Sequence, residues 1–297
     1  MATRVRLDSW LVEQGHFESR QQALRAVQAG DVRLDGQVAD KPGMPINGSP
    51  VVEIRSRPPY VSRGGEKLAG ALDKFEIDLA HRVAIDSGIS TGGFSDCLLQ
   101  RGVARIYGID VGYGQLAWAL RQDPRVSLME RTNLRHLTPL DLYGQGSDPQ
   151  HWADLATLDL SFISLTKILP ALWQLMRFPR ECLLLVKPQF EAGRAQVGKK
   201  GVIRDPQVQA EAVMRVWQTA AELGWQFRGL TYSPTPGPAG NIEYWLWIAE
   251  TEGSLGLELT TCLEMARHAQ AILAQANLKP DHFEKQLATP TSPPTSP

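Results

Sequence analysis

The chain of 297 residues has few cysteines and no long apolar run. Its three cysteines, Cys97, Cys182 and Cys262, are too far apart in sequence for a zinc-ligand motif or a disulfide framework. No stretch approaches the roughly 18 apolar residues of a membrane-spanning helix, and acidic residues interrupt the N-terminal segment before a signal sequence can form. We therefore expect a cytoplasmic protein with no membrane segment and no metal site.

The sequence also lacks an excess of charge of one sign. Lys and Arg number 31 against 32 Asp and Glu, a formal net charge of -1, which excludes a chain that binds nucleic acid over its whole surface. Any RNA contact must therefore be a local patch. A hydrophobic content of 43% and a charged content of 21% are typical of an ordinary globular protein, and the length predicts about two domains.

The first sixty residues have the pattern of a small α+β domain. Apolar residues at three- and four-residue spacings predict two short helices before Gly30, and alternating residues predict strands at 31–34 and 50–54. Pro58 and Pro59 mark a boundary, because consecutive prolines end regular structure. We therefore place the first domain at residues 1–58 and a linker at 59–62.

The remainder alternates short apolar runs with helical stretches, the pattern of an α/β fold with a parallel sheet. The expected strands are 83–86, 105–110, 126–130, 154–159, 182–187, 226–232 and 242–248, and the expected helices are 93–100, 115–121, 165–176 and 207–223. These elements predict a seven-stranded domain over residues 63–252. We expect a helical extension at 253–288, with a helix from about 257 to 276, and a disordered tail at 289–297, which is rich in Pro, Ser and Thr.

A glycine-rich segment, Asp86 to Phe94, leaves the first of these strands and opens a helix. Gly88, Gly92 and Gly93 would let a ligand approach bare backbone at the helix N-terminus. The spacing fits neither the dinucleotide fingerprint nor the P-loop, which favours a small cofactor without a pyrophosphate. Asp110, at the end of the next strand, is suited to bind ribose hydroxyls. The alternative interpretation is a plain strand–turn–helix corner.

Four polar residues are expected near the carboxyl ends of the strands, where an open α/β sheet binds its ligands: Lys67, Asp159, Lys187 and Glu243. Glu243 would reach the same edge only if its strand were antiparallel to the others. Two lysines flanked by two carboxylates can orient a lysine and tune it for proton handling. Any one of them alone would be more simply explained as half of a rim salt bridge, but the four together favour catalysis.

Two segments are candidates for binding RNA. The loop at 191–205 is basic and could clamp a polyanion, although a solvated surface loop is an equally good interpretation. The first sixty residues carry several arginines but a net charge of only +1, so RNA binding there depends on clustering on one face. The basic residues considered in the two segments are Arg4, Arg6, Arg20, Arg25, Arg33, Arg194, Lys199, Lys200 and Arg204.

The motifs together resemble a known family. The segments at 6–8, 19–23 and 29–36 resemble the S4 RNA-binding domain, and the rest is similar to the FtsJ-type, S-adenosylmethionine-dependent RNA ribose methyltransferases. With SRGGEKL at 62–68, DVGYGQL at 110–116, ERTN at 130–133, DLSFISL at 159–165, LVKPQFE at 185–191 and GNIE at 240–243, residues 4–250 resemble the TlyA (hemolysin A) family.

This resemblance implies a Rossmann-like methyltransferase domain preceded by an S4-like domain. It implies that Lys67, Asp159, Lys187 and Glu243 carry methyl transfer to a ribose 2′-hydroxyl of cytidine in ribosomal RNA or ribosomal subunits. We expect Lys187, oriented by Asp159 and Glu243, to take up the hydroxyl proton, and Lys67 to support the nucleotide. The implied contacts of S-adenosyl-L-methionine are Asp86, Gly88, Ser90, Thr91, Gly92, Gly93, Phe94, Asp110, Asn133 and Asp159, and Arg63 joins the RNA-binding set.

Three other classes of protein stay open. A pseudouridine synthase also carries an S4 domain, but it lacks a glycine-rich cofactor loop. A non-catalytic ribosome-assembly factor would bind RNA without methylating it. A membrane-lytic protein is suggested by the hemolysin name alone, because the sequence contains no amphipathic membrane helix. The target nucleotide and the oligomeric state are not determined by the sequence.

Overall fold

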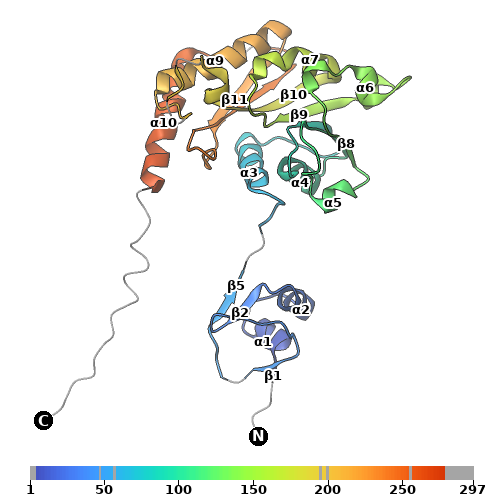
Figure 1. Ribbon diagram of the computed structural model, residues 1–297, viewed down its shortest axis with the longest axis vertical. Coiled ribbons are helices and arrows are strands. Elements are labelled where there is room, and N and C mark those ends of the chain that lie inside the picture. Colours follow the sequence, from blue (N-terminus) through green and yellow to red (C-terminus); the bar gives the residue numbers. More distant parts are fainter. Residues whose placement is uncertain are drawn as a thin grey trace, which may run out of the picture. The chain divides into compact units, whose positions relative to one another are not determined.

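The computed structural model describes residues 5–46, 48–55, 58–193, 196–198, 201–253 and 256–277. The chain forms two compact units, Met1–Pro59 and Tyr60–Pro297 (Figure 1). This division lies beside the linker predicted at 59–62. The predicted tail at 289–297 and four basic residues of the RNA-binding prediction lie outside the described residues: Arg4, Arg194, Lys199 and Lys200.

The first unit packs two helices against short strands. Its elements are β1 Val5–Arg6, α1 Leu7–Glu13, α2 Arg20–Gln28, β2 Val32–Leu34, β3 Gln37–Val38, β4 Pro45–Ile46 and β5 Val52–Ile54. β2 lies between β3 and β5 in an antiparallel sheet, and β1 pairs with β4. Ser19 caps α2 by accepting a hydrogen bond from the Gln22 backbone N–H, as capping preferences predict. Leu7, Leu11 and Val27 are fully buried between these elements.

The second unit is built on a seven-stranded sheet in the order β11, β12, β10, β9, β6, β7, β8, which confirms the predicted α/β fold. The strands are β6 Val83–Ser87, β7 Arg105–Ile109, β8 Val126–Met129, β9 Ala153–Leu158, β10 Met176–Val186, β11 Gln226–Tyr232 and β12 Tyr244–Ala249. Five neighbouring strands run parallel, whereas β12 is antiparallel to β10 and β11. Tyr244 therefore pairs with Val186, which brings Glu243 to the edge where Lys187 leaves β10.

Helices cover both faces of this sheet (Figure 1). On one face lie α3 Arg63–Phe75, α4 Gly93–Gln100 and α5 Trp118–Arg121, and on the other lie α7 Leu169–Leu175, α9 Pro206–Leu223 and α10 Leu259–Asn277. Successive strand residues alternate between the two cores: Ala84 packs with α3 and α4, and Ile85 with the opposite helices. Short elements fill the connections: η1 Leu134–His136, α6 Pro139–Tyr143, η2 Pro149–His151, η3 Leu165–Lys167 and α8 Pro188–Glu191.

Three elements of the second unit differ from their predicted bounds by three residues or more or are divided in two. The helix expected at 165–176 is split into η3 and α7, because Pro170 has no N–H to continue the ladder and stands in the first turn of α7. The helix expected from 115 begins at Trp118, because the Ala117 N–H is bound to the Thr91 carbonyl. β10 begins at Met176 instead of 182 and shifts register before Glu181.

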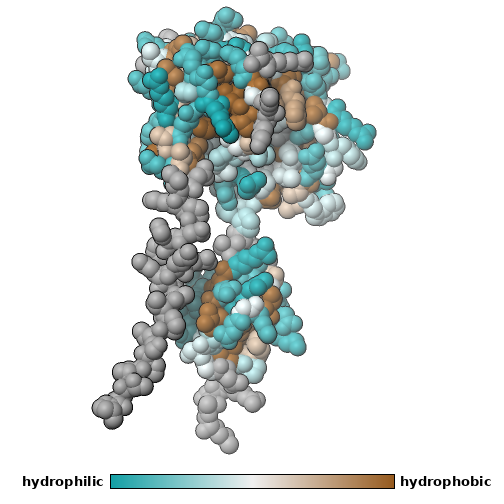
Figure 2. Space-filling model, turned by 60° about the vertical axis from the view of Figure 1, so that its left-hand side comes forward, coloured by the Kyte–Doolittle hydropathy of each residue, from teal (hydrophilic) through white to brown (hydrophobic). Residues whose placement is uncertain are grey.

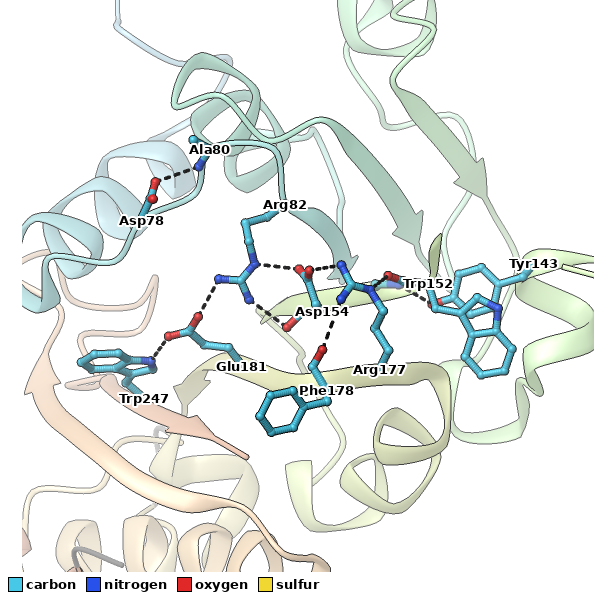
Figure 3. A network of polar contacts seen from close by, with 11 residues as sticks. Asp78, Ala80, Arg82, Tyr143, Trp152, Asp154, Arg177, Phe178, Glu181 and Trp247 are labelled. Carbon is cyan, nitrogen blue, oxygen red and sulfur yellow. Dashed lines mark hydrogen bonds and ion pairs between the residues drawn. The ribbon is translucent and has the colours of Figure 1, made fainter. Parts of the chain in front are cut away.

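A polar network ties the amino ends of the parallel strands together (Figure 3). Arg82, just before β6, reaches Asp154 Oδ1 at 2.7 Å and Glu181 Oε2 at 2.8 Å. Arg177 binds the second Asp154 oxygen at 2.5 Å, and Trp247 of β12 donates to Glu181 at 2.7 Å. The network therefore links β6, β9, β10 and β12 at the edge opposite to the strand ends that carry Asp159 and Lys187.

Hydrophilic residues cover most of the face shown in Figure 2, with smaller hydrophobic patches between them. Among the described residues, no helix is both long and apolar enough to cross a membrane.

Candidate active site

Two adjoining cavities lie at the carboxyl ends of β6 and β9. The larger has a volume of about 540 Å³ and the smaller about 240 Å³. Gly88, Ser90 and Asp159 line both cavities. Since Asp159 is the first residue after β9, the two cavities meet at the position where an open α/β sheet binds ligands.

The larger cavity carries the carboxylate predicted for a ribose. Asp110 is half-buried, and its two oxygens accept hydrogen bonds from the backbone N–H groups of Ser90, at 2.8 Å, and Gly112, at 2.6 Å. These bonds fix the carboxylate at the cavity wall and leave it further lone pairs for a ligand. Asn133 lines the same cavity, where its side-chain oxygen accepts from the Arg135 N–H at 3.1 Å.

Close packing against protein atoms explains why glycine stands at the three positions of the loop, Gly88, Gly92 and Gly93. A Cβ on Gly88 would lie 2.4 Å from the Asp159 carbonyl oxygen, and one on Gly93 would lie 2.2 Å from Ser62 Oγ. A Cβ on Gly92, whose φ is +95°, would lie 2.2 Å from Leu120 Cδ1. Neighbouring protein atoms therefore leave no room for a side chain at any of the three positions, and the approach of a ligand to their backbone stays a prediction. Gly88 and Gly93 still line a cavity, whereas Gly92 lines neither.

Asp86 lies beneath the site and lines neither cavity. It is fully buried, and its oxygens accept hydrogen bonds from Ser95 Oγ at 2.6 Å and Thr157 Oγ1 at 3.4 Å. Burial raises the pKa of Asp86 to about 7; the Ser95 bond opposes this rise, and the charge of Asp159 adds to it. Its hydrogen bonds therefore join β6, β9 and α4, and the predicted contact of Asp86 with a cofactor stays a prediction without a cavity surface to carry it.

The smaller cavity contains Lys67 of α3. Its ammonium lies 2.7 Å from Glu243 Oε2, and the two side chains are only 12% and 2% exposed. A Cβ on Gly237 would be 2.5 Å from the other Glu243 oxygen, so the Gly237 backbone packs directly on the carboxylate. Thr91, Gly93 and Phe94, which were predicted to contact a cofactor, line this cavity rather than the larger one.

The second lysine lies beside the point where the cavities meet. Lys187 Nζ lies 2.5 Å from Asp159 Oδ1 and donates to Ser161 Oγ at 3.1 Å. Among the described residues, the four side chains thus form two separate ion pairs, Lys67–Glu243 and Lys187–Asp159. The expectation that Glu243 helps to orient Lys187 is wrong, because Glu243 binds Lys67 and the second partner of Lys187 is Ser161.

Sequence reasoning did not single out Asn241, which anchors the basic loop next to Glu243. Its buried amide accepts from the Ile203 N–H at 2.9 Å and donates to the Gly201 carbonyl at 2.8 Å. The available signal was a polar residue inside the GNIE motif. Of the predicted RNA contacts in this unit, Arg63 lines the smaller cavity and Arg204 is exposed.

In the first unit, two of the predicted arginines lie together. Arg6 and Arg20 both bind Asp8 Oδ2, at 2.9 and 3.1 Å, while their own side chains remain more than half exposed. The hydrogen bond from Arg6 is the main cause that lowers the pKa of the buried Asp8 to about 2. Arg25 and Arg33 are exposed on the same unit.

Comparisons with known proteins match both units. The sequence model of the FtsJ-like methyltransferases matches residues 60–250, and that of the S4 domain matches residues 5–52. The chain is 48% identical to the 16S/23S rRNA (cytidine-2′-O)-methyltransferase TlyA of Mycobacterium tuberculosis, over 87% of this chain and 96% of that protein. It is 35% identical to Hemolysin A of Brachyspira hyodysenteriae, over 81% of this chain and 98% of that protein.

The solved structure of a proposed hemolysin from Streptococcus thermophilus is also similar, with a TM-score of 0.70 and 37% identity over 94% of this chain and 100% of that one. The resemblance to the TlyA family is therefore confirmed across both units. Because the methyltransferase match spans most of the chain and the relatives align over nearly their whole length, the chain belongs to the FtsJ-like methyltransferase family, with an S4 domain before the methyltransferase domain.

Proposed function

We propose that this protein transfers a methyl group from S-adenosyl-L-methionine to the 2′-hydroxyl of a cytidine in ribosomal RNA. The observation that carries the proposal is the pair of cavities that share Gly88, Ser90 and Asp159. A direct transfer requires a donor site and an acceptor site that meet at the reacting atoms. The name of the Mycobacterium tuberculosis relative supports the choice of substrate.

The larger cavity suits the cofactor. Its volume is within the range of about 300–1,000 Å³ found for small-molecule sites, and it carries a fixed carboxylate, Asp110, of the kind that binds ribose hydroxyls. We assign Gly88, Ser90, Asp110 and Asn133 to cofactor binding on this basis. When bound, S-adenosyl-L-methionine supplies an activated methyl group.

The smaller cavity suits the target nucleotide. Arg63 lines it and is exposed, which suits a phosphate, and Glu243 holds the partly buried Lys67 in its wall. Lys187 accepts the hydroxyl proton as the neutral amine and becomes an ammonium, and Asp159 and Ser161 hold its Nζ where the cavities join. Lys67 stabilises the negative charge that develops on the ribose oxygen.

Binding of the ribosomal RNA outside the active site is assigned to the S4 domain. Arg6 and Arg20 share one buried acid and keep most of their side chains exposed, so they present two guanidinium groups on one face. Guanidinium groups bind phosphates well, and such contacts position an RNA without reading its sequence. We infer that the protein acts on this substrate in the cytoplasm.

The test is Lys187→Ala in the full chain, with single-turnover transfer of labelled methyl to ribosomal RNA as the measurement. We expect a loss of roughly 10²-fold or more in rate, with cofactor affinity unchanged by calorimetry because Asp110 and the loop are untouched. Lys187→Arg should fail as well, since a guanidinium stays protonated. Lys167→Ala, which removes an exposed lysine of η3, is the matched control and should keep the wild-type rate. A wild-type rate in Lys187→Ala would overturn the assignment.

A further inference from the structure

A buried carboxylate close to the site has no part in the proposed chemistry. Glu191 ends α8, four residues after Lys187, and only 4% of it is exposed. Its Oε2 accepts a hydrogen bond from Ser164 Oγ at 2.5 Å, and its Oε1 accepts from the Leu165 N–H at 2.8 Å. Burial raises the pKa of Glu191, and the Ser164 bond opposes this rise, so a charged carboxylate at this position is costly.

These two hydrogen bonds join the loops that carry the reacting residues. β9 and β10 are neighbouring parallel strands, and the loops after them begin at Asp159 and Lys187. Glu191, on the loop after β10, reaches across to Ser164 and Leu165 on the loop after β9. The segment 159–165 is thus held at both ends by the same neighbour: by Lys187 at its start and by Glu191 at its end.

The segment between these two attachments needs external support. Phe162 has a φ of +65°, a left-handed conformation that is unfavourable for a bulky side chain, and its ring is 92% exposed. Leu160, Ser161 and Ile163 line the larger cavity beside it. Without a fixed end at Ser164, this backbone would relax and carry Ser161 away from Lys187.

We infer that Glu191 is a positioning residue, which clamps the loop 159–165 so that Asp159 and Ser161 hold the Lys187 ammonium at the junction of the cavities. The inference rests on the proposed function. A carboxylate accepts both bonds, whereas the amide of a glutamine has one acceptor oxygen and would have to donate to Ser164 Oγ, which already accepts from the Thr166 N–H at 3.2 Å. A shorter side chain cannot span the two loops.

The experiment compares Glu191→Gln, Glu191→Asp and Ser164→Ala with the wild-type full chain. Loss of one buried bond to a carboxylate should lower the single-turnover rate of methyl transfer by about tenfold or more. The KM for ribosomal RNA should stay within about twofold, because the RNA does not touch Glu191. The rate should stay low at saturating cofactor, since the loop also lines the larger cavity and a weaker cofactor affinity alone would be overcome by more cofactor. Since Ser164→Ala cuts the clamp from the other side, combining it with Glu191→Gln should cost less than the two losses multiplied together.

Urea unfolding of the same samples and the control Glu211→Gln separate positioning from stability. Glu211 is a half-buried, hydrogen-bonded glutamate of α9 that lines neither cavity, and its substitution should leave the rate unchanged. If the Glu191 and Ser164 variants lose stability while the folded protein transfers methyl at the wild-type rate, the inference is overturned. An inactive wild-type enzyme would overturn the proposed function instead. If a Glu191 variant does not fold, the methyl-transfer rate of Ser164→Ala alone still tests the clamp, because this variant removes one of its two hydrogen bonds.

Discussion

The substitution Arg82→Ala should destabilise the second unit strongly without affecting the site. Arg82 is 19% exposed and contacts Asp154 and Glu181, whose side chains are only 6% and 12% exposed. Its removal leaves Glu181 without a cation in this network and Asp154 with Arg177 alone. Breaking a buried pair from one side costs about 3–5 kcal/mol. For a unit of this size, that cost lowers the Tm by about 6–20 °C.

The assay is urea unfolding followed by the fluorescence of the eight tryptophans, with a calorimetric cofactor titration on the folded protein. Cofactor affinity should not change, because the network lies at the opposite edge of the sheet from the cavities. Arg125→Ala is the control: Arg125 is 46% exposed and pairs with Asp123 at the surface, an interaction worth about 1 kcal/mol or less. If Arg82→Ala costs no more than this control, or weakens the cofactor in the folded protein, the network does not hold the sheet as described.

Three further predictions test the site and its support. Gly92→Ala should cost about 1–3 kcal/mol of unfolding free energy, because its Cβ would displace Leu116 and Leu120 at a φ of +95°; an unchanged urea midpoint would contradict this. The pKa of Asp86 is raised to about 7, so that, as the pH falls, the native state takes up a proton at a higher pH than the unfolded chain does. The free energy of unfolding should therefore rise as pH falls, by about 2 kcal/mol from pH 7 to pH 5, relative to Asp86→Asn, and parallel pH curves would refute it. A fragment of residues 60–297 should fold and bind cofactor but lose most of its affinity for ribosomal RNA, as filter binding would show, and full retention would exclude an RNA-binding role for the S4 domain.

The elements with strong apolar patterns were predictable from the sequence. β11 begins and ends at the predicted residues, Gln226 and Tyr232, because its boundaries coincide with changes in pattern. The start of β10 was missed, because Arg177 and Arg180 look like loop residues when read alone. In the structure each has an acidic partner, Asp154 and Glu250 respectively, which allows charged residues to stand in a strand.

The sequence indicated which residues belong to the site, but it did not indicate which of them contact one another. Strand ends and motifs pointed to Lys67 and Glu243, yet their pairing depends on the direction of β12 and on α3, which are far apart in sequence. The packing that requires glycine at position 93 also depends on residues far apart in sequence. The atom that a Cβ there would meet belongs to Ser62, about thirty residues earlier. Local spacing shows that a small residue is needed but not which distant neighbour requires it.

The wall shared by the two cavities has a consequence for inhibitor design. Under the proposed assignment of the two cavities, a compound that carries an adenosine group for the larger cavity and a cytidine group for the smaller one needs only a short linker past Gly88 and Asp159. Once one half is bound, the other is held at a high effective concentration beside its own cavity. Such a bisubstrate compound should bind much more tightly than either half. It should also discriminate against methyltransferases whose acceptor pocket has a different shape.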